Sequence, residues 1–421
     1  MLSSLNSREE GEQDPHPLRR CSSPYPSPRQ LLIRCAELIH HADLPAARRA
    51  ISLLSAASSP FGDSADRIVH QFTRALSLQV DRLSLQSPLS TSFPSAAGDT
   101  DEAIQSSYLH LNQITPFLRF AHLTANQAIL EAVDGHRRIH ILDFDTSHGV
   151  QWPPLLQAIA DRSDPSDPPS IRITGTGTDM DVLRRTAHRL HFFANSLNLP
   201  FHFHPLLVPS SLPTSAANST SFASFQLHSG ETLAVNCVFF LHKLIKNEPD
   251  CYRDVRSFLR SIRALNPAVV TMAEREASHN SPAFLQRFIE ALEHYTVVFE
   301  SLEATLPPTS RERMVVERVW LGREIAAVVA GEDRFERFEK WEEMMRAAGL
   351  TAAPLSPFAV SQARLLLRLH YPSEGYQLQV VRDSCFLGWQ TKPLFSVEQF
   401  NKPNILKQWE ELVRRESMKR D

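Results

Sequence analysis

The residues with the clearest potential for chemistry stand at the end of a short apolar run. Eight positions of this run and the loop after it define the segment: Ile139, His140, Ile141, Leu142, Asp143, Gly149, Gln151 and Trp152. An apolar strand with an acidic end, a loop and a proline-opened helix are typical first units of a doubly wound α/β sheet. Loops beyond the carboxyl ends of such strands form the ligand crevice. Asp143 therefore stands where a Rossmann-like enzyme places a cofactor-binding carboxylate.

The glycine pattern argues against a cofactor at this position. A dinucleotide or S-adenosylmethionine site needs glycines directly after the strand, so that the backbone can approach the ligand closely. Here Phe144, Asp145 and Thr146 carry side chains into that space, and the single glycine, Gly149, comes late. The alternative is a structural Asp143 that accepts hydrogen bonds from backbone N–H groups of the loop. We favour the structural role, and we predict no cofactor.

Other catalytic or metal-binding patterns are weak. The sequence shows no Ser-His-Asp order, no paired-carboxylate spacing and no P-loop lysine, so nucleophilic and phosphoryl-transfer chemistry have no visible machinery. The histidines His140, His148, His202 and His204 lack a metal-ligand rhythm. His202 and His204 share one face of an expected strand, which leaves a metal conceivable in principle, but an edge or core role is favoured and no metal site is predicted.

Composition limits the class of protein. The 421 residues are 42% hydrophobic and 22% charged, with a net charge of -3 and a pI near 6.7, which excludes a generally basic nucleic-acid binder. Any DNA contact must therefore come from a local patch or from a partner. Five scattered cysteines without a CxxC pair indicate a reducing compartment. No apolar run reaches the ~18 residues of a membrane span, so we expect a soluble intracellular protein without membrane contact.

The first third of the chain predicts helices. We expect a disordered segment over 1–29, a helical cap over 30–135 and a Ser/Pro linker over 84–100 within it. Two pairs of apolar residues, each pair seven residues apart, are candidates for a partner-binding surface: Leu31 with Leu38, and Leu44 with Ile51. A coiled-coil-like partner surface and internal packing of the cap both fit so short a pattern.

The remainder predicts an α/β core over 136–397 with a mostly parallel, Rossmann-like (methyltransferase-like) sheet, next to the N-terminal helical cap. Expected strands are 139–143, 171–174, 201–204, 233–240 and 268–272, followed by an antiparallel pair at 376–381 and 385–389. Helices are expected around 282–298, 311–330, 333–347 and 357–369, with some helices of the core joining the cap, and 207–230 is a Ser/Thr-rich insertion.

One helix, expected after the second strand, carries a basic cluster. The cluster is Arg184, Arg185, His188 and Arg189. As DNA-contact candidates, these side chains would bind phosphates with salt-dependent affinity. As the solvated face of an amphipathic helix, they would have no partner at all, and both interpretations stay open.

Several motifs together resemble the plant GRAS family. The segment from Ile139 to Trp152 resembles its VHIID motif, and Leu387-Gly388-Trp389 resembles the start of its SAW region. Leu265-Asn266-Pro267 and the stretch from Phe288 to Tyr295 are similar to parts of the PFYRE region, as is Arg323-Glu324. The structural motif residues are Pro267, Phe288, Tyr295, Arg323, Glu324 and Trp389. The segments 58–63 and 176–185 look most like the Lateral suppressor, or scarecrow-like, branch.

The resemblance covers about residues 31–397 and implies function. It implies a non-enzymatic transcription regulator in the nucleus that is needed to start axillary shoot meristems. Implied partners are other transcription factors and GRAS proteins, with a homodimer among the options, and DNA reached directly or through partners. The alternative is an S-adenosylmethionine-dependent methyltransferase or a small-molecule-binding protein on the same fold.

Two expectations concern packing. We expect Arg323 and Glu324 to form a buried ion pair that fixes the cap against the sheet, and Trp152 and Trp389 to be core anchors. The family ending diverges at Ser396 to Phe400, so 398–421 is expected to be an unrelated tail, which puts the packing of the last strand in question.

Overall fold

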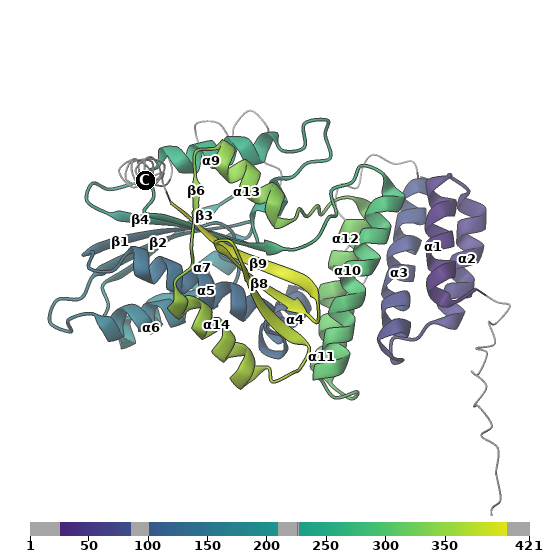
Figure 1. Cartoon of the computed structure of the whole chain (residues 1–421), viewed down its shortest axis with the longest axis horizontal. Helices are drawn as coiled ribbons and strands as arrows, with labels where there is room; N and C mark the ends of the chain where they lie inside the picture. The colour runs from purple at the N-terminus through teal and green to yellow at the C-terminus, as the bar shows by residue number, and fades with distance from the viewer. Residues whose placement is uncertain (1–25, 86–100, 209–224, 226, 402–421) are drawn as a thin grey trace, which may run out of the picture.

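A single sheet forms the centre of the molecule in the computed structural model, which describes residues 26–85, 101–208, 225 and 227–401 (Figure 1). Within these residues the strand order is β3-β2-β1-β4-β5-β9-β8-β7, and β6 pairs with β9. The strands are β1 (Arg138–Asp143), β2 (Ser170–Gly177), β3 (Phe201–Leu207), β4 (Thr232–Val238), β5 (Val269–Arg275), β6 (Thr351–Ala353), β7 (Tyr376–Val381), β8 (Ser384–Trp389) and β9 (Lys392–Asn401).

The parallel half confirms the predicted Rossmann-like core. Strands β3, β2, β1, β4 and β5 pair in parallel, and β1 and β4 are buried on both faces, as their continuous apolar runs predict. The strand order reverses between β1 and β4, which makes this the topological switch point where ligands bind in open α/β sheets. Asp143 and Asn236 are register partners at that point.

The antiparallel half contains more than the expected terminal pair β7–β8, because a third long strand, β9, lies between this pair and β5. β9 pairs antiparallel with β5 on one side and β8 on the other. The expected tail from 398 is therefore wrong over its first four residues, since Glu398 and Phe400 are buried in the sheet. Polar Ser396 and Glu398 interrupt the apolar pattern of this strand, which is why the sequence did not predict it.

Helices cover both faces of the sheet. One face carries α9 (Arg253–Ala264) and α13 (Phe338–Ala347), and the other carries α5 (Phe117–Ala132), α6 (Trp152–Arg162), α7 (Met180–Ser196) and α14 (Pro357–His370) (Figure 1). A short 3-10 helix, η1 (Leu241–Leu244), follows β4. No helix in the described ranges is long and apolar enough to cross a membrane.

The cap combines helices from two distant parts of the chain. It contains α1 (Pro28–His40), α2 (Leu44–Ala57), α3 (Ser64–Leu85), α4 (Asp101–Ile114), α10 (Phe284–Thr305), α11 (Arg311–Val315), the π-helical turn η2 (Val316–Leu321) and α12 (Gly322–Ala330) (Figure 1). Buried Arg67 on α3 donates to Glu317 on η2 over 2.8 Å and so joins the two parts. Helix α5 packs on the sheet, so the cap expected over 30–135 is corrected at that helix.

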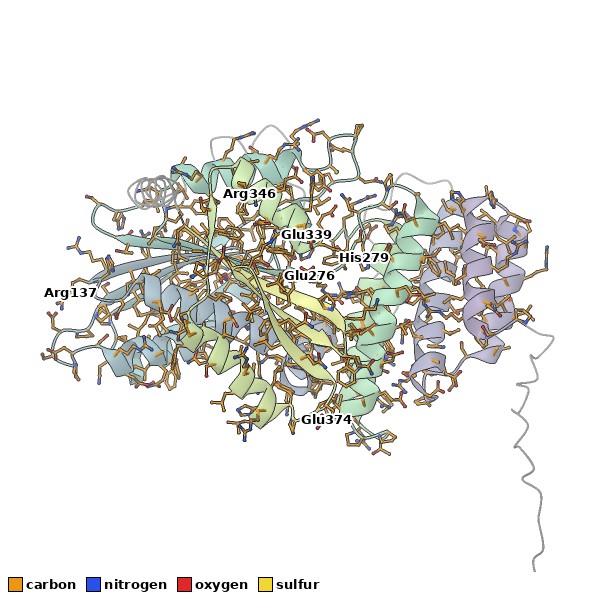
Figure 2. All side chains as sticks on the ribbon, viewed as in Figure 1. Arg137, Glu276, His279, Glu339, Arg346 and Glu374 are labelled. Carbon is orange, nitrogen blue, oxygen red and sulfur yellow. The ribbon has the colours of Figure 1, made fainter. Side chains whose placement is uncertain are left out.

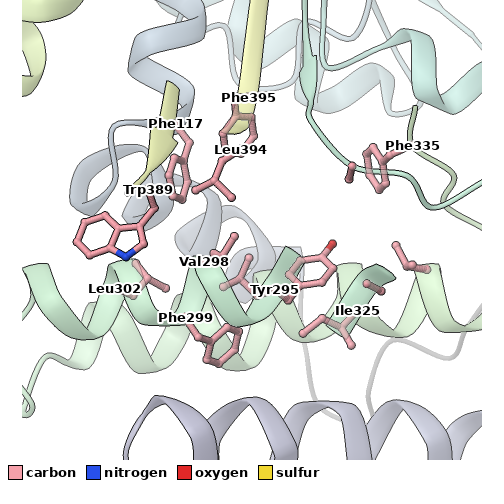
Figure 3. Close-up of a cluster of buried hydrophobic side chains, with 14 of the residues drawn as sticks. Phe117, Tyr295, Val298, Phe299, Leu302, Ile325, Phe335, Trp389, Leu394 and Phe395 are labelled. Carbon is pink, nitrogen blue, oxygen red and sulfur yellow. The ribbon is translucent and has the colours of Figure 1, made fainter. Parts of the chain in front are cut away.

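Cap and sheet share one hydrophobic core. Figure 3 shows Val298 and Leu302 of α10 on the side of Leu394 and Trp389 of the antiparallel strands, whereas Phe299 points to the other side of α10. The same cluster continues outward to helices α1 to α3. Buried apolar residues on both sides of position 135/136 belong to this one cluster. The boundary expected there between cap and core therefore does not divide the hydrophobic core.

Several sequence expectations fall outside the described residues. These are 1–25 of the expected disordered segment, 86–100 of the linker, 209–224 and 226 of the insertion, and 402–421 of the tail. The chain turns helical earlier than expected, because Ser27 and Gln30 form a capping box ahead of α1.

A buried pair of acids beside α13 predicts a pH dependence of stability. Burial raises the pKa of Glu276 to about 7, although its carboxylate accepts a hydrogen bond from the Phe338 N–H. The pKa of buried Glu398 is also raised, by burial and by neighbouring Glu276. An acid whose pKa rises on folding costs stability as pH rises from its unfolded pKa towards its folded pKa.

We expect Glu276→Gln to flatten the loss of stability between pH values near 4.5 and 7. The difference in unfolding free energy across this window should shrink by about 1–3 kcal/mol, measured by urea denaturation at both ends. Glu374→Gln is the matched control, since Glu374 is exposed at the surface whereas Glu276 lies inside (Figure 2). A wild-type pH profile in Glu276→Gln would contradict this assignment.

Candidate functional site

The Asp143 carboxylate is closed off by side-chain donors. The Trp152 indole donates to Oδ2 over 2.8 Å and the Asn236 amide donates to Oδ1 over 2.8 Å. The donors are thus side chains, whereas the sequence suggested backbone N–H groups. Asp143, Trp152 and Asn236 are all buried, so both oxygens have protein partners instead of a ligand.

A wider polar network continues from this carboxylate. Gln151 and Asn236 exchange amide hydrogen bonds of 3.1 Å in both directions, and Thr271 of β5 donates to Asn236 over 3.0 Å. Asn126 of α5 donates to the Gln151 carbonyl over 2.7 Å. The network therefore joins β1, β4, β5, α5 and the start of α6 at the switch point. Asn126 and Thr271 were missed; the sequence signal available for Asn236 was a lone amide inside an apolar strand.

Burial has a measurable electrostatic effect on the central acid. It raises the pKa of Asp143 to about 6, while the hydrogen bond from Asn236 acts in the opposite direction. A carboxyl with this environment is held as an acceptor by two donors. Its hydrogen bonds to Trp152 and Asn236 position the loop after β1.

The loop after β1 departs from the expectation in one place. Phe144 points to the opposite face of the sheet, where its ring packs on Phe225, Phe240 and Phe258. Asp145 forms an ion pair with Lys243 on η1. Gly149 has a φ of +65°, and a Cβ there would lie 2.5 Å from the Thr186 methyl group, so only glycine fits.

A cavity of about 1040 Å³ opens between this loop and the cap. Asp143, Asp145 and Thr146 line it on the core side, and Tyr108 and Trp320 line it on the cap side. The expectation that side chains fill the pocket is therefore wrong beyond the carboxylate itself. The cap stands away from the switch point there, and the loop is too short to fill the space.

The residues present fit a nucleotide-like cofactor poorly. Asp143 is already bound by two donors, and Asp179, which follows β2, caps α7 by accepting from the N–H groups of Asp181 and Val182. Both oxygens of Asp143 thus accept protein hydrogen bonds, whereas the cap of α7 uses only Oδ1 of Asp179. In the described part of the chain, no group of three or more His, Cys, Asp or Glu could hold a metal ion.

The remaining VHIID-like residues are structural in their surroundings. Ile139 and Ile141 are buried in the cluster beneath α5 and α6, whereas Leu142 belongs to the cluster on the opposite face. His140 is fully buried, and its Nε2 lies 2.9 Å from the Thr174 hydroxyl. Burial lowers the pKa of His140 to about 4, which keeps the ring neutral.

The motif residues of the second half are also buried. Phe288 and Tyr295 on α10 contact the Phe72 ring at centroid distances of 5.4 and 6.3 Å. Trp389 packs against Tyr376 at 4.9 Å, in agreement with a core anchor. Pro267 is buried just before β5.

The expected ion pair between Arg323 and Glu324 is wrong. Glu324 on α12 accepts two hydrogen bonds from Arg275 at the end of β5, whereas Arg323 is exposed. Burial opposes the charged form of Arg275, but the Glu324 carboxylate outweighs it and raises the pKa of the guanidinium. The Arg275 guanidinium also lies 5.3 Å from the Phe335 ring centroid. Glu324 thus fixes the cap against the sheet, with a cation that the sequence did not assign.

The basic cluster lies exposed on α7. Arg184, Arg185, His188 and Arg189 all face solvent. Arg184 pairs with Asp181 over 3.2 Å, and Arg189 donates to the His148 carbonyl over 3.0 Å, which ties α7 to the loop after β1. Two of the four side chains therefore already have protein partners.

The partner-binding candidates are less exposed than a free surface requires. Leu31, Leu38, Leu44 and Ile51 are partly buried and pack against the shared core. The large apolar side chains that are exposed near them are Leu53, at 61%, and Phe61, at 80%. The apolar periodicity identified these helix faces correctly, but it did not show that they pack against the protein's own core.

Together these features define a class of protein: a Rossmann-like α/β fold with a helical cap, in which the carboxylate at the switch point accepts hydrogen bonds from the protein's own side chains. The chain belongs to the GRAS domain family, whose model matches residues 28–399, and the predicted family is confirmed. It is 52% identical over 397 residues to Protein MONOCULM 1 of Oryza sativa subsp. japonica, covering 88% of each chain.

Two further relatives support this assignment. Scarecrow-like protein 18 of Arabidopsis thaliana is 46% identical over 409 residues, covering 88% of this chain and 91% of that protein. The crystal structure of SCL7 in Oryza sativa superposes with a TM-score of 0.71 at 33% identity, covering 90% of this chain and 100% of that chain. The predicted fold class is therefore confirmed by a solved structure.

The corrected ion pair gives a direct stability test. We expect Glu324→Gln to lower the unfolding free energy by about 3 kcal/mol, because the Arg275 charge loses its partner at the interface between cap and sheet. Arg323→Gln, the matched neighbour, should change it by less than about 0.5 kcal/mol. Urea denaturation of both variants measures the difference. A larger loss of stability in Arg323→Gln than in Glu324→Gln would contradict the pairing of Glu324 with Arg275.

Proposed function

We propose that this protein is a non-enzymatic transcription regulator that acts in the nucleus through contacts with other proteins. Family membership supports the regulatory role, and the closed Asp143 carboxylate is the observation that carries the non-enzymatic part. By resemblance, its biological task is the initiation of axillary shoot meristems. Its partners are other transcription factors and GRAS proteins, including a second copy of the chain.

The outer cap supports the mode of action. Leu53 on α2 and Phe61 in the connection from α2 to α3 are both exposed. Helices α1 and α2 form the end of the molecule farthest from the sheet (Figure 1). Exposed apolar side chains on a stable helical surface favour protein contacts over DNA contacts. The net charge of -3 agrees with DNA reached mainly through a partner. Direct DNA contact through α7 is the secondary part of this proposal.

The competing function is an S-adenosylmethionine-dependent methyltransferase. The cavity at the switch point is the observation in its favour. Against it stand the Asp143 carboxylate, both of whose oxygens accept hydrogen bonds from protein side chains, and the lack of a glycine directly after β1.

Calorimetry with S-adenosylmethionine separates these functions. We expect no binding at micromolar ligand by the wild-type chain, because both oxygens of Asp143 already accept protein hydrogen bonds and no glycine follows β1 directly. Micromolar binding that is lost in Asp143→Ala, with circular dichroism unchanged, would establish the enzyme reading of the fold instead.

Chromatin occupancy tests the cap. We expect the double change Leu53→Asp and Phe61→Asp to reduce genome-wide occupancy several-fold, because it removes the apolar contact without opening the core. Leu369→Asp is the matched control, since Leu369 is 62% exposed on α14, away from the cap. Leu38→Asp is a poorer test, because Leu38 packs against the core and its change would also lower stability.

A variant of the basic helix α7 is measured in the same chromatin-occupancy experiment. Arg185→Gln should reduce occupancy less than the cap change does if partners carry the protein to DNA. If α7 contacts phosphate directly, the same change should reduce the salt dependence of DNA binding by about one unit of slope. If Arg185→Gln lowers chromatin occupancy while the cap variant keeps full occupancy, direct DNA contact through α7 is primary and the proposed ranking is reversed.

A further inference from the structure

The π-helical turn η2 and the first turn of α12 each place one arginine in the cavity. A π-helix bonds residue i to residue i+5, so side chains five apart approach one face, which they would not do in an α-helix. Arg318 and Arg323 are five apart, and both line the cavity. Both side chains are exposed, and neither guanidinium makes a hydrogen bond or an ion pair with another residue that the structure describes.

The other charged groups of the cavity are largely neutralised. Lys243 pairs with Asp145, and Arg275 pairs with Glu324. Asp143 is held by its two donors. Glu332 pairs with Arg82, and Asp333 is a further carboxylate of the lining. The cations Arg74, Arg318 and Arg323 outnumber it, so the remaining charge on the cap wall is positive on balance.

Aromatic surface lies beside these arginines. Tyr108 of α4 contacts the Trp320 ring at a centroid distance of 5.3 Å and the His148 ring at 5.5 Å. Phe239 and Phe395 line the cavity from the sheet. The Trp320 Nε1 is buried without a hydrogen-bond partner among the described residues, so an unused N–H donor accompanies the two cations.

We propose that this cavity binds a small organic anion, with a carboxylate or similar oxyanion carried on an apolar ring body. Arg318 and Arg323 supply charge-assisted hydrogen bonds to the oxyanion, and the Trp320 N–H supplies a further donor. The ring body lies against Tyr108 and the phenylalanines of the sheet. A volume of about 1040 Å³ suits a ligand of this size with accompanying water.

The ligand would contact both cap and core. Trp320 and Arg323 belong to cap helices, whereas Phe239 and Phe395 belong to the sheet region. This binding activity goes beyond the proposed regulatory function, and it is measurable without DNA or a protein partner.

Two fluorescent probes of the same ring system provide the test. 8-Anilinonaphthalene-1-sulfonate carries an anionic group, whereas N-phenyl-1-naphthylamine lacks it. In titrations of the full chain, we expect the anionic probe to bind at one site roughly 10-fold more tightly than the neutral probe. The double change Arg318→Gln and Arg323→Gln should abolish this preference while leaving binding of the neutral probe unchanged.

Two further variants locate the site. Arg364→Gln with Arg368→Gln is the charge-matched control, since both arginines are exposed on α14 and neither lines the cavity. It should keep the wild-type preference. Ala327→Phe, which adds a ring to the cavity wall, should weaken both probes several-fold. An anionic preference that survives the Arg318 and Arg323 changes, or probe binding that is unaffected by Ala327→Phe, would overturn the proposal.

Discussion

The carboxylate of Asp143 is the constraint around which the centre of this molecule is arranged. A buried carboxylate must be supplied with donors, and here they come from Trp152 and Asn236. Gln151 then fixes Asn236, and Asn126 fixes the Gln151 carbonyl. Five secondary elements are thereby held in one register at the switch point of the sheet. The place where related folds bind a cofactor is used here to hold the protein together.

The cap depends on this centre through a second polar contact and a shared apolar core. Arg275 reaches from β5 to Glu324 on α12, and around this pair the core runs without a break from sheet to cap. An ion pair surrounded by apolar packing contributes to a defined orientation more than to stability. The cavity is the space that this arrangement leaves between the cap and the carboxyl ends of the strands.

Much of the fold follows from local patterns, whereas the site follows only in part. Strands β1, β4 and β5 were predicted because strands buried on both faces require continuous apolar runs. β9 was missed because Glu398, buried and carrying a raised pKa, looks like a solvent-facing residue in the sequence. Arg323 was chosen as the partner of Glu324 by adjacency, although the true partner, Arg275, lies 49 residues away. Side chains that meet only through tertiary packing leave no periodic signal, which also explains the misassigned side of Phe144.

The position of β9 has a consequence for the order of synthesis. This strand is the last in the described chain, yet it lies between β5 and the β7–β8 hairpin in the middle of the sheet. Until the ribosome has released it, the parallel half presents β5 as an unpaired edge and the hairpin has no attachment to the rest. The nascent protein therefore carries an open sheet from the synthesis of β5 until that of β9, a period in which molecular chaperones have an exposed edge to protect.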